Sequence, residues 1–508
     1  MEWGCLRAES SKALNPLQNL DIPSFRAPAP RLSSAVWAEI LIFEKRQRAE
    51  GSLPVDLGPH PVSTATLCMD KHLPMQPNLI CANHRRSVHR WLGGFVLLAV
   101  SVGRIASAVA GAAENVVDPK QDWPGWRGPS ADGIAAPGQT PPIRWSETNN
   151  VLWQAPVPGR GHGSPCVIGD RIYLPTSERE RQSQSVLCFD RATGKLLWQR
   201  EVHCGEPNNG KHVNSSSASS TIAGDGSRLF ITFLNAGAVH ATSLDPQGKI
   251  LWQRKICDYV AHQGFGASPV LYGPLVLVSA DHRGGGTLAG LDRVTGEVVW
   301  SVARPKIPNY TTPAIVQAAG RPQMVLAGCN LLTSLDPATG KKLWEVECST
   351  EECVTTAASD GVRVFASGGY PRNHTVSVLA DGSGKIAWQS ATRLYVPSPI
   401  IKDGHIYAVL DSGIAVCWKS DTGAECWKER LGGDFYSSPV MVGDRIYATN
   451  LGGKTFVFEA TPAKFQVLAE NQLGDEVFAT PSICGNRIYM RVAKNGEHRQ
   501  EFLFCVGN

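Results

Sequence analysis

The chain has 508 residues, which is more than one ordinary domain needs. Its formal net charge is only +4, so we expect no nucleic-acid partner, because such partners call for strongly basic surfaces. The 50 glycines, 34 prolines and 14 tryptophans are typical of an all-β protein with many turns and disfavour a helical one.

Residues 1–113 are predicted to form a non-globular leader. Their first 74 residues show no sustained hydrophobic period, so no packed core is expected there. Two interpretations stay open: this stretch is disordered, or translation starts later, at Met69 or Met75. A later start would bring the segment that follows close to the N-terminus, where export signals lie.

A signal peptide is predicted near residues 84–112. Arg85 and Arg86 precede an apolar run over residues 91–102, and small residues of the A-x-A type follow, which is the order of a secretion signal. An uncleaved membrane anchor is the alternative, but the run is short for a span and is followed closely by Arg104. We therefore expect cleavage, no stable membrane span, and an exported protein that is periplasmic or extracellular.

A repeat that ends in tryptophan runs through the rest of the chain. Its form is D-x-x-T-G-K-x-x-W, in which Asp caps a turn, Gly takes a position with positive φ, and Trp packs against a neighbouring unit. Upstream in each unit, Ser-Pro or Thr-Pro opens an alternating apolar run, and a turn with Gly leads into a second run. This alternation predicts four short antiparallel strands in each unit. The repeat places six tryptophans at the docking position: Trp198, Trp252, Trp300, Trp344, Trp388 and Trp427.

The count of units predicts an all-β fold, an eight-bladed β-propeller of four-stranded antiparallel blades. The seventh unit carries Val467 where the others have Trp, and the eighth, which starts at Thr480, lacks its last strand. We expect an N-terminal strand with Trp153 in the docking position to complete the eighth blade and close the ring, because closure removes open sheet edges. The propeller is then residues 150–508, and residues 114–149 form an N-terminal extension.

These motifs resemble the PQQ-like (pyrroloquinoline-quinone-like) repeat family of the quinoprotein alcohol dehydrogenase-like superfamily, over roughly residues 145–506. The resemblance implies an eight-bladed propeller. The repeats are also similar to the periplasmic propeller subunit of the outer-membrane β-barrel assembly machinery, which implies a protein partner in the cell envelope. The segment D-W-P-G-W-R-G-P-S-A-D-G-I at residues 122–134 looks like the lead-in of exported planctomycete-type members.

Functional residues are expected on the face of the propeller that carries the connections between blades and those between the second and third strands. The turns on the opposite face are short and uniform, so we interpret them as structural. The irregular loops of the first face could bind an acidic ligand or a partner protein; a solvated rim is the alternative. The candidate residues of this ligand or partner face are Arg160, Lys211, Asp258, Asp281, Arg283, Tyr370 and Arg372.

Histidines recur on the same predicted face, three of them just ahead of the first strand in consecutive blades. Because the first strand is innermost, these side chains could converge near the axis on a metal ion or an anion. The alternative is loop histidines that bond to backbone groups or water. No carboxylate accompanies them at ligand spacing, so we expect no metal site. The candidates are His162, His212, His262 and His282.

The favoured function is a non-catalytic binding or scaffold propeller, monomeric and without a cofactor, that takes a small ligand or an envelope protein on this face. The alternative, implied by the quinoprotein resemblance, is a PQQ-dependent dehydrogenase. Such an enzyme would need a Ca²⁺ site of carboxylate and amide groups, an Asp base and an aromatic floor for the quinone. The family enzymes also carry a disulfide between adjacent cysteines, and this sequence has no adjacent cysteines. A hydrolase or lyase is a third class, without a nucleophile–base pattern behind it.

Eleven of the 14 cysteines follow the leader. Cys417 with Cys426, and Cys348 with Cys353, flank short turns, so either pair could form a disulfide in an oxidising compartment. The alternative, which we favour for most of the cysteines, is a small buried hydrophobic side chain.

Overall fold

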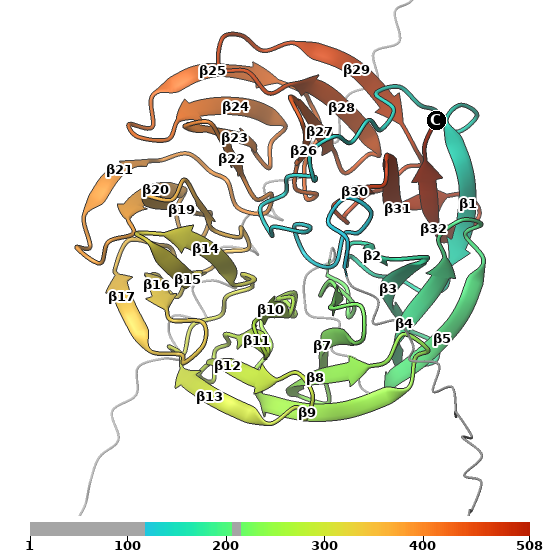
Figure 1. Cartoon of the computed structure of the whole chain (residues 1–508), viewed down its shortest axis with the longest axis horizontal. Coiled ribbons are helices and arrows are strands. Elements are labelled where there is room, and N and C mark those ends of the chain that lie inside the picture. Colours follow the sequence, from blue (N-terminus) through green and yellow to red (C-terminus); the bar gives the residue numbers. More distant parts are fainter. Residues whose placement is uncertain (1–116, 206–214) are drawn as a thin grey trace, which may run out of the picture. The chain divides into compact units, whose positions relative to one another are not determined.

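The computed structural model describes residues 117–205 and 215–508, in which the regular secondary structure consists of β-strands. The chain divides into two units, Met1–Ile105 and Ala106–Asn508, and the described residues all lie in the second. The predicted leader and its signal peptide lie outside them. No helix in the described part of the chain is long and apolar enough to cross a membrane. Eight four-stranded antiparallel sheets surround a central axis, which confirms the predicted propeller (Figure 1).

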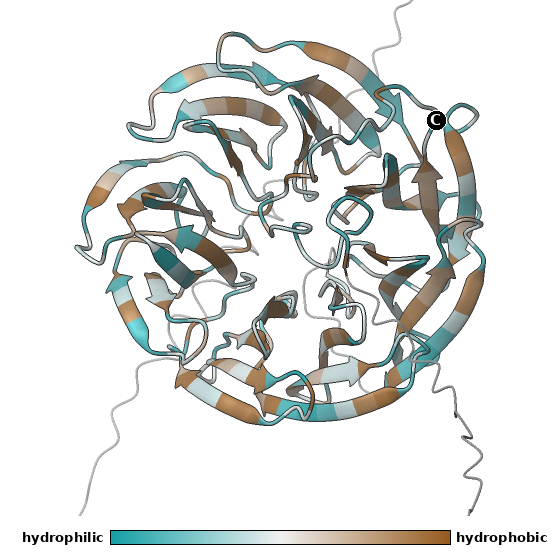
Figure 2. Ribbon diagram, viewed as in Figure 1, coloured by the Kyte–Doolittle hydropathy of each residue, from teal (hydrophilic) through white to brown (hydrophobic). Residues whose placement is uncertain are grey.

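Each blade runs from an inner strand near the axis to an outer strand at the rim (Figure 1), and hydrophobic residues concentrate on the strands while the loops are largely hydrophilic (Figure 2). Blades one to four consist, from inside outward, of β2 (Cys166–Ile168), β3 (Arg171–Glu178), β4 (Ser183–Asp190), β5 (Leu196–Cys204); β6 (Ala223–Gly224), β7 (Leu229–Asn235), β8 (Ala238–Leu244), β9 (Ile250–Asp258); β10 (Val270–Tyr272), β11 (Leu275–Ala280), β12 (Thr287–Asp292), β13 (Val298–Ala303); and β14 (Ala314–Ala318), β15 (Arg321–Gly328), β16 (Leu331–Leu335), β17 (Lys342–Val346). Blades five to eight consist of β18 (Ala358–Ser359), β19 (Arg363–Gly368), β20 (His374–Leu379), β21 (Ile386–Ser390); β22 (Ile400–Lys402), β23 (His405–Val409), β24 (Ile414–Lys419), β25 (Glu425–Arg430); β26 (Val440–Val442), β27 (Arg445–Thr449), β28 (Lys454–Glu459), β29 (Val467–Gln472); and β30 (Ser482–Cys484), β31 (Arg487–Asn495), β32 (Arg499–Val506), β1 (Val151–Val157).

The N-terminal strand closes the ring, as predicted. β1 pairs antiparallel with β32, and Trp153 lies opposite Cys505. The eighth blade therefore takes its three inner strands from the C-terminal end of the chain and its outer strand from the N-terminal side. Backbone hydrogen bonds across this pair join the first and last segments of the propeller.

The docking tryptophans pack on the next blade. Trp252 Nε1 donates to the carbonyl of Arg293 at 3.0 Å, and its ring lies against Gly296 in the third turn of that blade. A Cβ at Gly296 would stand 2.6 Å from the indole, and the φ of +71° is left-handed, so both the space and the backbone require glycine. Trp153 and Trp388 likewise donate to a carbonyl of the following blade. The Gly and the Trp of the repeat are thus two halves of one contact.

The Ser and Thr residues that precede the inner strands, six of them in Ser-Pro or Thr-Pro motifs, form a chain of hydrogen bonds around the axis. The backbone N–H of Ser438 donates to Thr480 Oγ1 at 2.9 Å, and that of Thr480 donates to Ser164 Oγ at 3.1 Å, which links the last blade to the first. Among the described residues, seven of the eight blade junctions carry this bond. The remaining hydroxyl, Thr356 Oγ1, accepts a bond from Trp126 Nε1 at 2.8 Å. These bonds therefore tie the inner strands of adjacent blades at all junctions but the one between blades four and five.

The docking position of the seventh blade differs from the prediction. Strand pairing places Val467 opposite Phe458, whereas Ala469 lies opposite Val457 on the other side of a bulge. The register of Ala469 is the one that Trp427 has in the sixth blade. The assignment of Val467 to this position was wrong by two residues, because the turn before β29 lacks the D-x-x-T-G motif from which to count.

A tryptophan of the N-terminal extension packs in the blade that has alanine at this position. Trp145 is 5% exposed, belongs to the same hydrophobic cluster as Ala469, and stacks on Tyr447 of β27. In five other blades the docking tryptophan lies beside an aromatic residue of the second strand. The N–H of Trp145 also donates to Asn471 Oδ1 at 2.8 Å. The extension thus supplies the aromatic side chain that β29 lacks at its docking position.

The extension continues across the interior of the ring (Figure 1). Trp123 pairs with Val167 on the inner edge of β2, and Ile134 pairs with Met441 on the inner edge of β26. These bridges cover strand edges that would otherwise face the axis. The extension lies on the side of the short turns, because the N–H of Gly169, in the first turn of blade one, donates to a carboxylate of the extension at 2.8 Å.

Arg127 anchors the extension inside the ring. Its side chain is 3% exposed and donates to the carbonyls of Ser398, Pro399 and Pro439, at 2.6 to 3.3 Å. Burial lowers the pKa of Arg127 to about 10, and the charge of Asp132 opposes this shift, so the guanidinium stays charged at neutral pH. A buried cation held by several carbonyl dipoles has one favourable position, which fixes the extension against blades six and seven.

All eleven cysteines of the described residues are thiols in this structure. Cys417 and Cys426 lie on adjacent strands with their thiols in contact, and burial raises the pKa of Cys417 to about 12. Cys348 and Cys353 are both buried, and burial raises the pKa of each. The two disulfides therefore stay predictions.

Candidate ligand-binding cavity at the propeller axis

A cavity of about 600 Å³ lies at the axis, on the face that carries the connections between blades. This volume is within the range of small-molecule binding sites. The lining residues come from the loops that precede the inner strands and from the β23–β24 connection. Trp126 of the extension is also among them, and its bond to Thr356 holds the indole at the level of the hydroxyl ring. Because the extension crosses the ring on the side of the short turns, Trp126 forms the floor and the mouth opens on the opposite face.

One position of the repeat supplies a lining residue from every blade. It is the second residue before the Ser or Thr of the hydroxyl ring, as Tyr436 stands before Ser438 and Phe478 before Thr480. The repeat determines where this residue lies, while its type changes from blade to blade and sets the chemistry of the cavity. The eight residues are His162, Ser219, Gly266, Tyr310, Val354, Val396, Tyr436 and Phe478.

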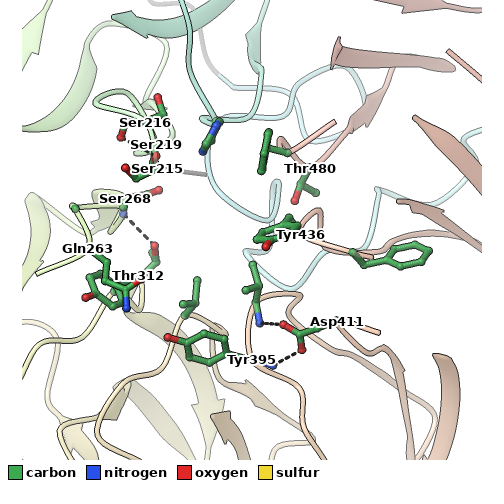
Figure 3. A pocket seen from close by; sticks show the side chains of 18 of the residues that line it. Ser215, Ser216, Ser219, Gln263, Ser268, Thr312, Tyr395, Asp411, Tyr436 and Thr480 are labelled. Atoms are coloured by element: carbon green, nitrogen blue, oxygen red, sulfur yellow. Dashed lines mark hydrogen bonds between the residues drawn. The ribbon is translucent and has the colours of Figure 1, made fainter. Parts of the chain in front are cut away.

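The cavity has a hydroxyl-rich wall and an aromatic wall. Figure 3 shows the labelled serines and Gln263 on one side, and Tyr395 and Tyr436 away from them. The hydroxyl-rich wall comes from the loops before β6 and β10 and includes Ser215, Ser216, Ser219 and Gln263, with Phe265 from the second of these loops beside them. The aromatic wall comes from the loops before β22, β26 and β30 and consists of Tyr395, Phe435, Tyr436 and Phe478.

Two charged residues of the lining are engaged with the protein. Asp411 accepts the backbone N–H groups of Tyr395 at 2.8 Å and of Val396 at 3.1 Å, one on each carboxylate oxygen (Figure 3). Burial raises the pKa of Asp411. Arg393 donates to the carbonyl of Gly369 at 2.9 Å, and its guanidinium lies 4.9 Å from the centre of the Tyr395 ring. These groups are therefore partly satisfied before any ligand enters.

A buried glutamate stands behind the wall. Glu352 is 2% exposed, and its Oε1 lies 3.0 Å from His262 Nδ1, while its Oε2 accepts the Tyr395 hydroxyl at 3.4 Å. The Tyr310 hydroxyl lies 3.5 Å from the same His262 nitrogen. Burial, and then the charge of Glu352, raise the pKa of Tyr310; the same two causes raise that of Tyr395. Both phenols are thus neutral at physiological pH. Asp434 is the exposed carboxylate of the lining.

Of the three predicted histidines in the described part of the chain, His162 is the one that lines the cavity. Its ring stacks on Phe478 with the ring centroids 4.1 Å apart and the planes 19° apart. Its Nε2 is buried, and no partner for it occurs among the described residues. Burial lowers the pKa of His162 well below its ordinary value, and the charges of Arg160 and Arg491 act in the same direction. The imidazole is therefore neutral.

The two other histidine candidates that the structure describes do not join it. His262 faces the buried glutamate, and His282 Nδ1 accepts the backbone N–H groups of Val260 at 3.2 Å and Gly284 at 3.0 Å. His212 lies outside the described residues. No group of three or more His, Cys, Asp or Glu residues that could hold a metal ion occurs in the described part of the chain.

Four of the seven predicted ligand or partner residues are exposed, and none of those that the structure describes lines the cavity. Arg160 is half-buried, with its guanidinium 5.9 Å from the centre of the Phe478 ring. Lys211 lies outside the described residues. The exposed members of the set are Asp258, which pairs with Lys255 at 2.6 Å, Arg283, Tyr370 and Arg372.

Asp281 has a different position from the one expected. Its carboxylate pairs with Arg304 at 3.1 Å, and both side chains are 2% exposed. Asn309 donates to the same carboxylate at 3.1 Å. The β11–β12 loop and the β13–β14 connection are thereby joined, so Asp281 stabilises the loops and does not present its charge to a ligand.

The aromatic wall and its floor were not predicted from the sequence. The sequence contains a pattern that could have identified Tyr436 and Phe478, because they stand two residues before a Ser-Pro or Thr-Pro motif. Tyr395 stands three residues before such a motif. No sequence pattern identifies Trp126 as a lining residue, since it lies outside the repeats and reaches the cavity only through the path of the extension.

A family model described as outer membrane protein assembly factor BamB matches residues 134–256, 182–372 and 372–464. The chain belongs to this family. A BamB of Burkholderia pseudomallei (strain K96243) is 23% identical over 367 residues, which is 68% of this chain and 86% of that relative. A polyvinylalcohol dehydrogenase of Pseudomonas sp is 23% identical over 240 residues, 42% of this chain and 37% of that relative. The quinohemoprotein alcohol dehydrogenase from Comamonas testosteroni has the same fold, with a TM-score of 0.57 at 12% identity over 77% of this chain and 81% of that one.

The dehydrogenase relatives of this BamB-family chain raise the question of PQQ. The quinone is planar and carries several carboxylates, so its site must supply an aromatic face together with cations or a metal ion. Trp126 offers the aromatic face, but the described residues of the lining include a single guanidinium, Arg393, beside the carboxylates of Asp411 and Asp434. No cysteine is among the described lining residues. The donor set does not fit a polyanionic quinone.

Proposed function

We propose that the protein is an exported, non-catalytic binding propeller whose ligand enters the axial cavity. The observation that carries this proposal is the ring of eight lining residues, one from each blade, above a floor supplied by Trp126. A cavity built from all blades and closed at one end is a preformed site on a rigid scaffold. The exposed loops around the mouth, with Arg283, Tyr370 and Arg372, are the surface that we assign to a protein partner.

The chemistry of the lining favours binding without catalysis. His162 is the neutral base of the cavity, yet its Nε2 has no partner among the described residues, so it activates no hydroxyl in this arrangement. Asp411 is held by two backbone N–H groups, which leaves it poorly placed to accept a proton from a substrate.

The names of the relatives support a binding role in the cell envelope. The Burkholderia relative is an outer membrane protein assembly factor, and the family model carries the same description. The signal-like order of residues 84–112 supports export. A PQQ-dependent dehydrogenase is the second candidate, favoured by the indole floor and by the polyvinylalcohol dehydrogenase relative.

A matched pair of variants tests the cavity. A Cβ at Gly266 would meet the Cβ of Ser219 at 3.7 Å, an ordinary contact, so Gly266→Trp places a ring in the cavity without backbone strain. Gly496 lies in the exposed β31–β32 loop with nothing within 4 Å of its Cβ position, and Gly496→Trp serves as the control. The purified proteins are incubated with a small-molecule extract of the source cells, and retained compounds are identified by mass spectrometry.

We expect wild type and Gly496→Trp to retain a compound that Gly266→Trp does not. Equal retention by all three proteins, or by none, would contradict the proposal. The same proteins are then supplied with PQQ and Ca²⁺ and assayed for oxidation of alcohols and aldoses with an artificial electron acceptor. Turnover that requires PQQ would overturn the non-catalytic role in favour of the dehydrogenase.

A further inference from the structure

We infer that the ligand of the axial cavity is a neutral saccharide of about one to three sugar units. The inference rests on the proposed function, since it names the class of molecule that the same cavity takes. It stands on three properties of the lining: hydroxyls that can still donate, aromatic faces opposite them, and little uncommitted charge.

The hydroxyl ring provides donors. Thr221, Ser268, Thr312 and Thr480 line the cavity, and each hydroxyl oxygen accepts one backbone N–H from the preceding blade. A hydroxyl that accepts one bond still has a proton to donate. Gln263 adds an amide that both donates and accepts. Sugar hydroxyls, which also do both, can satisfy these groups in several arrangements.

The aromatic wall and the floor provide flat apolar surfaces. Tyr436 and Phe478 lie edge to face with their ring centroids 5.4 Å apart, and Trp126 lies at the level of the hydroxyl ring. One face of a pyranose is covered by C–H groups, which pack on aromatic rings while the hydroxyls at the rim of the sugar remain free to bond. A ligand with one apolar and several polar aspects therefore matches the two walls.

The charges of the lining disfavour ionic ligands. Asp411 is occupied by backbone N–H groups, Arg393 by a carbonyl and an aromatic ring, and the phenols of Tyr310 and Tyr395 are neutral. His162 is neutral as well. Among the described residues, a ligand anion would meet no uncommitted cation, and a ligand cation would meet only Asp434, which is exposed to solvent. Either charge costs more to bury than a hydroxyl that finds hydrogen bonds. The volume of about 600 Å³ suits a small oligosaccharide.

Calorimetric titration with defined sugars tests the inference. The probes are maltose, cellobiose, lactose and mannobiose, each against wild type, Gly266→Trp and Gly496→Trp. Glucuronic acid and glucosamine are the charged counterparts of glucose. We expect at least one neutral disaccharide to bind wild type and Gly496→Trp equally, to bind Gly266→Trp at least tenfold more weakly, and both charged sugars to bind at least tenfold more weakly than glucose.

A second pair of variants tests the stacking role of the aromatic wall. Tyr436→Phe keeps the ring and Tyr436→Ala removes it, so we expect the first to retain affinity within about threefold and the second to lose at least tenfold. Unfolding temperatures show whether each variant remains folded. Equal affinities of folded Tyr436→Ala and wild type would overturn the assigned stacking.

The experiment with the cell extract distinguishes failure of the saccharide inference from failure of the proposed binding function. If the cavity retains a compound that is not a saccharide, and no sugar binds, the saccharide inference is overturned while the binding function stands. If neither a sugar nor any extract compound depends on Gly266, both fail together.

Discussion

The indole of Trp145 lies on the ring of Tyr447, with the ring centroids 6.3 Å apart and the planes 11° apart. This contact belongs to the seventh blade, where Ala469 stands at the position that carries a docking tryptophan in the sixth. The extension that precedes the propeller is thus part of its core, and it also supplies the floor of the axial cavity through Trp126.

Removal of the Trp145 side chain is expected to destabilise the propeller. We expect Trp145→Ala to lower the free energy of unfolding by about 3 kcal/mol, because a buried indole leaves a cavity when it is truncated. Denaturant unfolding of the purified protein measures the loss.

Ala469→Trp provides the complement. In wild type it forces a second indole into an occupied space and destabilises the blade. In the Trp145→Ala background the new ring has room, so the double variant is expected to be more stable than either single variant. A double variant whose losses simply add would contradict the exchange of one ring for the other.

Arg127 is expected to determine whether the extension stays in the ring. Arg127→Met leaves the carbonyls of Ser398, Pro399 and Pro439 without their donor, and we expect a loss of about 3 kcal/mol or more. Arg127→Lys keeps the charge but not the planar fork of donors, so an intermediate loss is expected.

Limited proteolysis shows where Arg127 acts. Release of the extension predicts early cleavage between residues 117 and 150 in Arg127→Met, with the blades intact. Cleavage spread evenly over the propeller would instead mean that Arg127 supports the blades directly.

Ring closure depends on β1. Deletion of residues 150–157 removes the outer strand of the eighth blade and exposes β32, so we expect loss of the cooperative unfolding transition. Deletion of residues 1–112 is the control and is expected to shift the transition temperature little. Similar effects of the two deletions would count against closure by this strand.

Acid is expected to destabilise the first two blades through a pair of histidines. The rings of His203 and His240 have their centroids 4.9 Å apart, and burial, with the charge of His240, lowers the pKa of His203 to about 4. Unfolding returns this pKa to about 6.5, so the unfolded chain binds more protons between these values. Stability present above pH 6.5 is therefore lost as the pH falls toward 4.

The expected contribution of His203 is about 1 kcal/mol less stability at pH 5.5 than at pH 7.5. His203→Gln removes the titrating group, and its free energy of unfolding should fall less over this interval than that of wild type. An identical pH dependence in both proteins would show that His203 does not contribute.

Much of the fold could be predicted because its signals are local. The Gly of each D-x-x-T-G turn and the Trp that follows it are a few residues apart, and together they indicate one hairpin and one docking contact. The motif is absent before β29, and the sequence therefore predicted Val467, in place of Ala469, at the docking position. The buried pairing of Asp281 with Arg304 had no such signal, since their loops meet only in the folded blade.

The candidate cavity was predicted only in its location. The sequence placed the candidate site on the face where this cavity lies and named one lining residue, His162, but neither Trp126 nor the aromatic wall. Side chains from eight blades meet there because the propeller places equivalent loops around one axis. No local sequence pattern predicts which of these side chains face each other.

The sequence by itself determined the number of blades, their strand order and the position of the loops, because turn chemistry and period-two alternation act between near neighbours. Only the tertiary structure decided that Trp145 completes the seventh blade, that Arg127 holds the extension against the inner strands and that Trp126 forms the floor of the cavity. These contacts join residues far apart in the chain, and their free energy comes from burial and hydrogen bonds that exist only when the ring is closed.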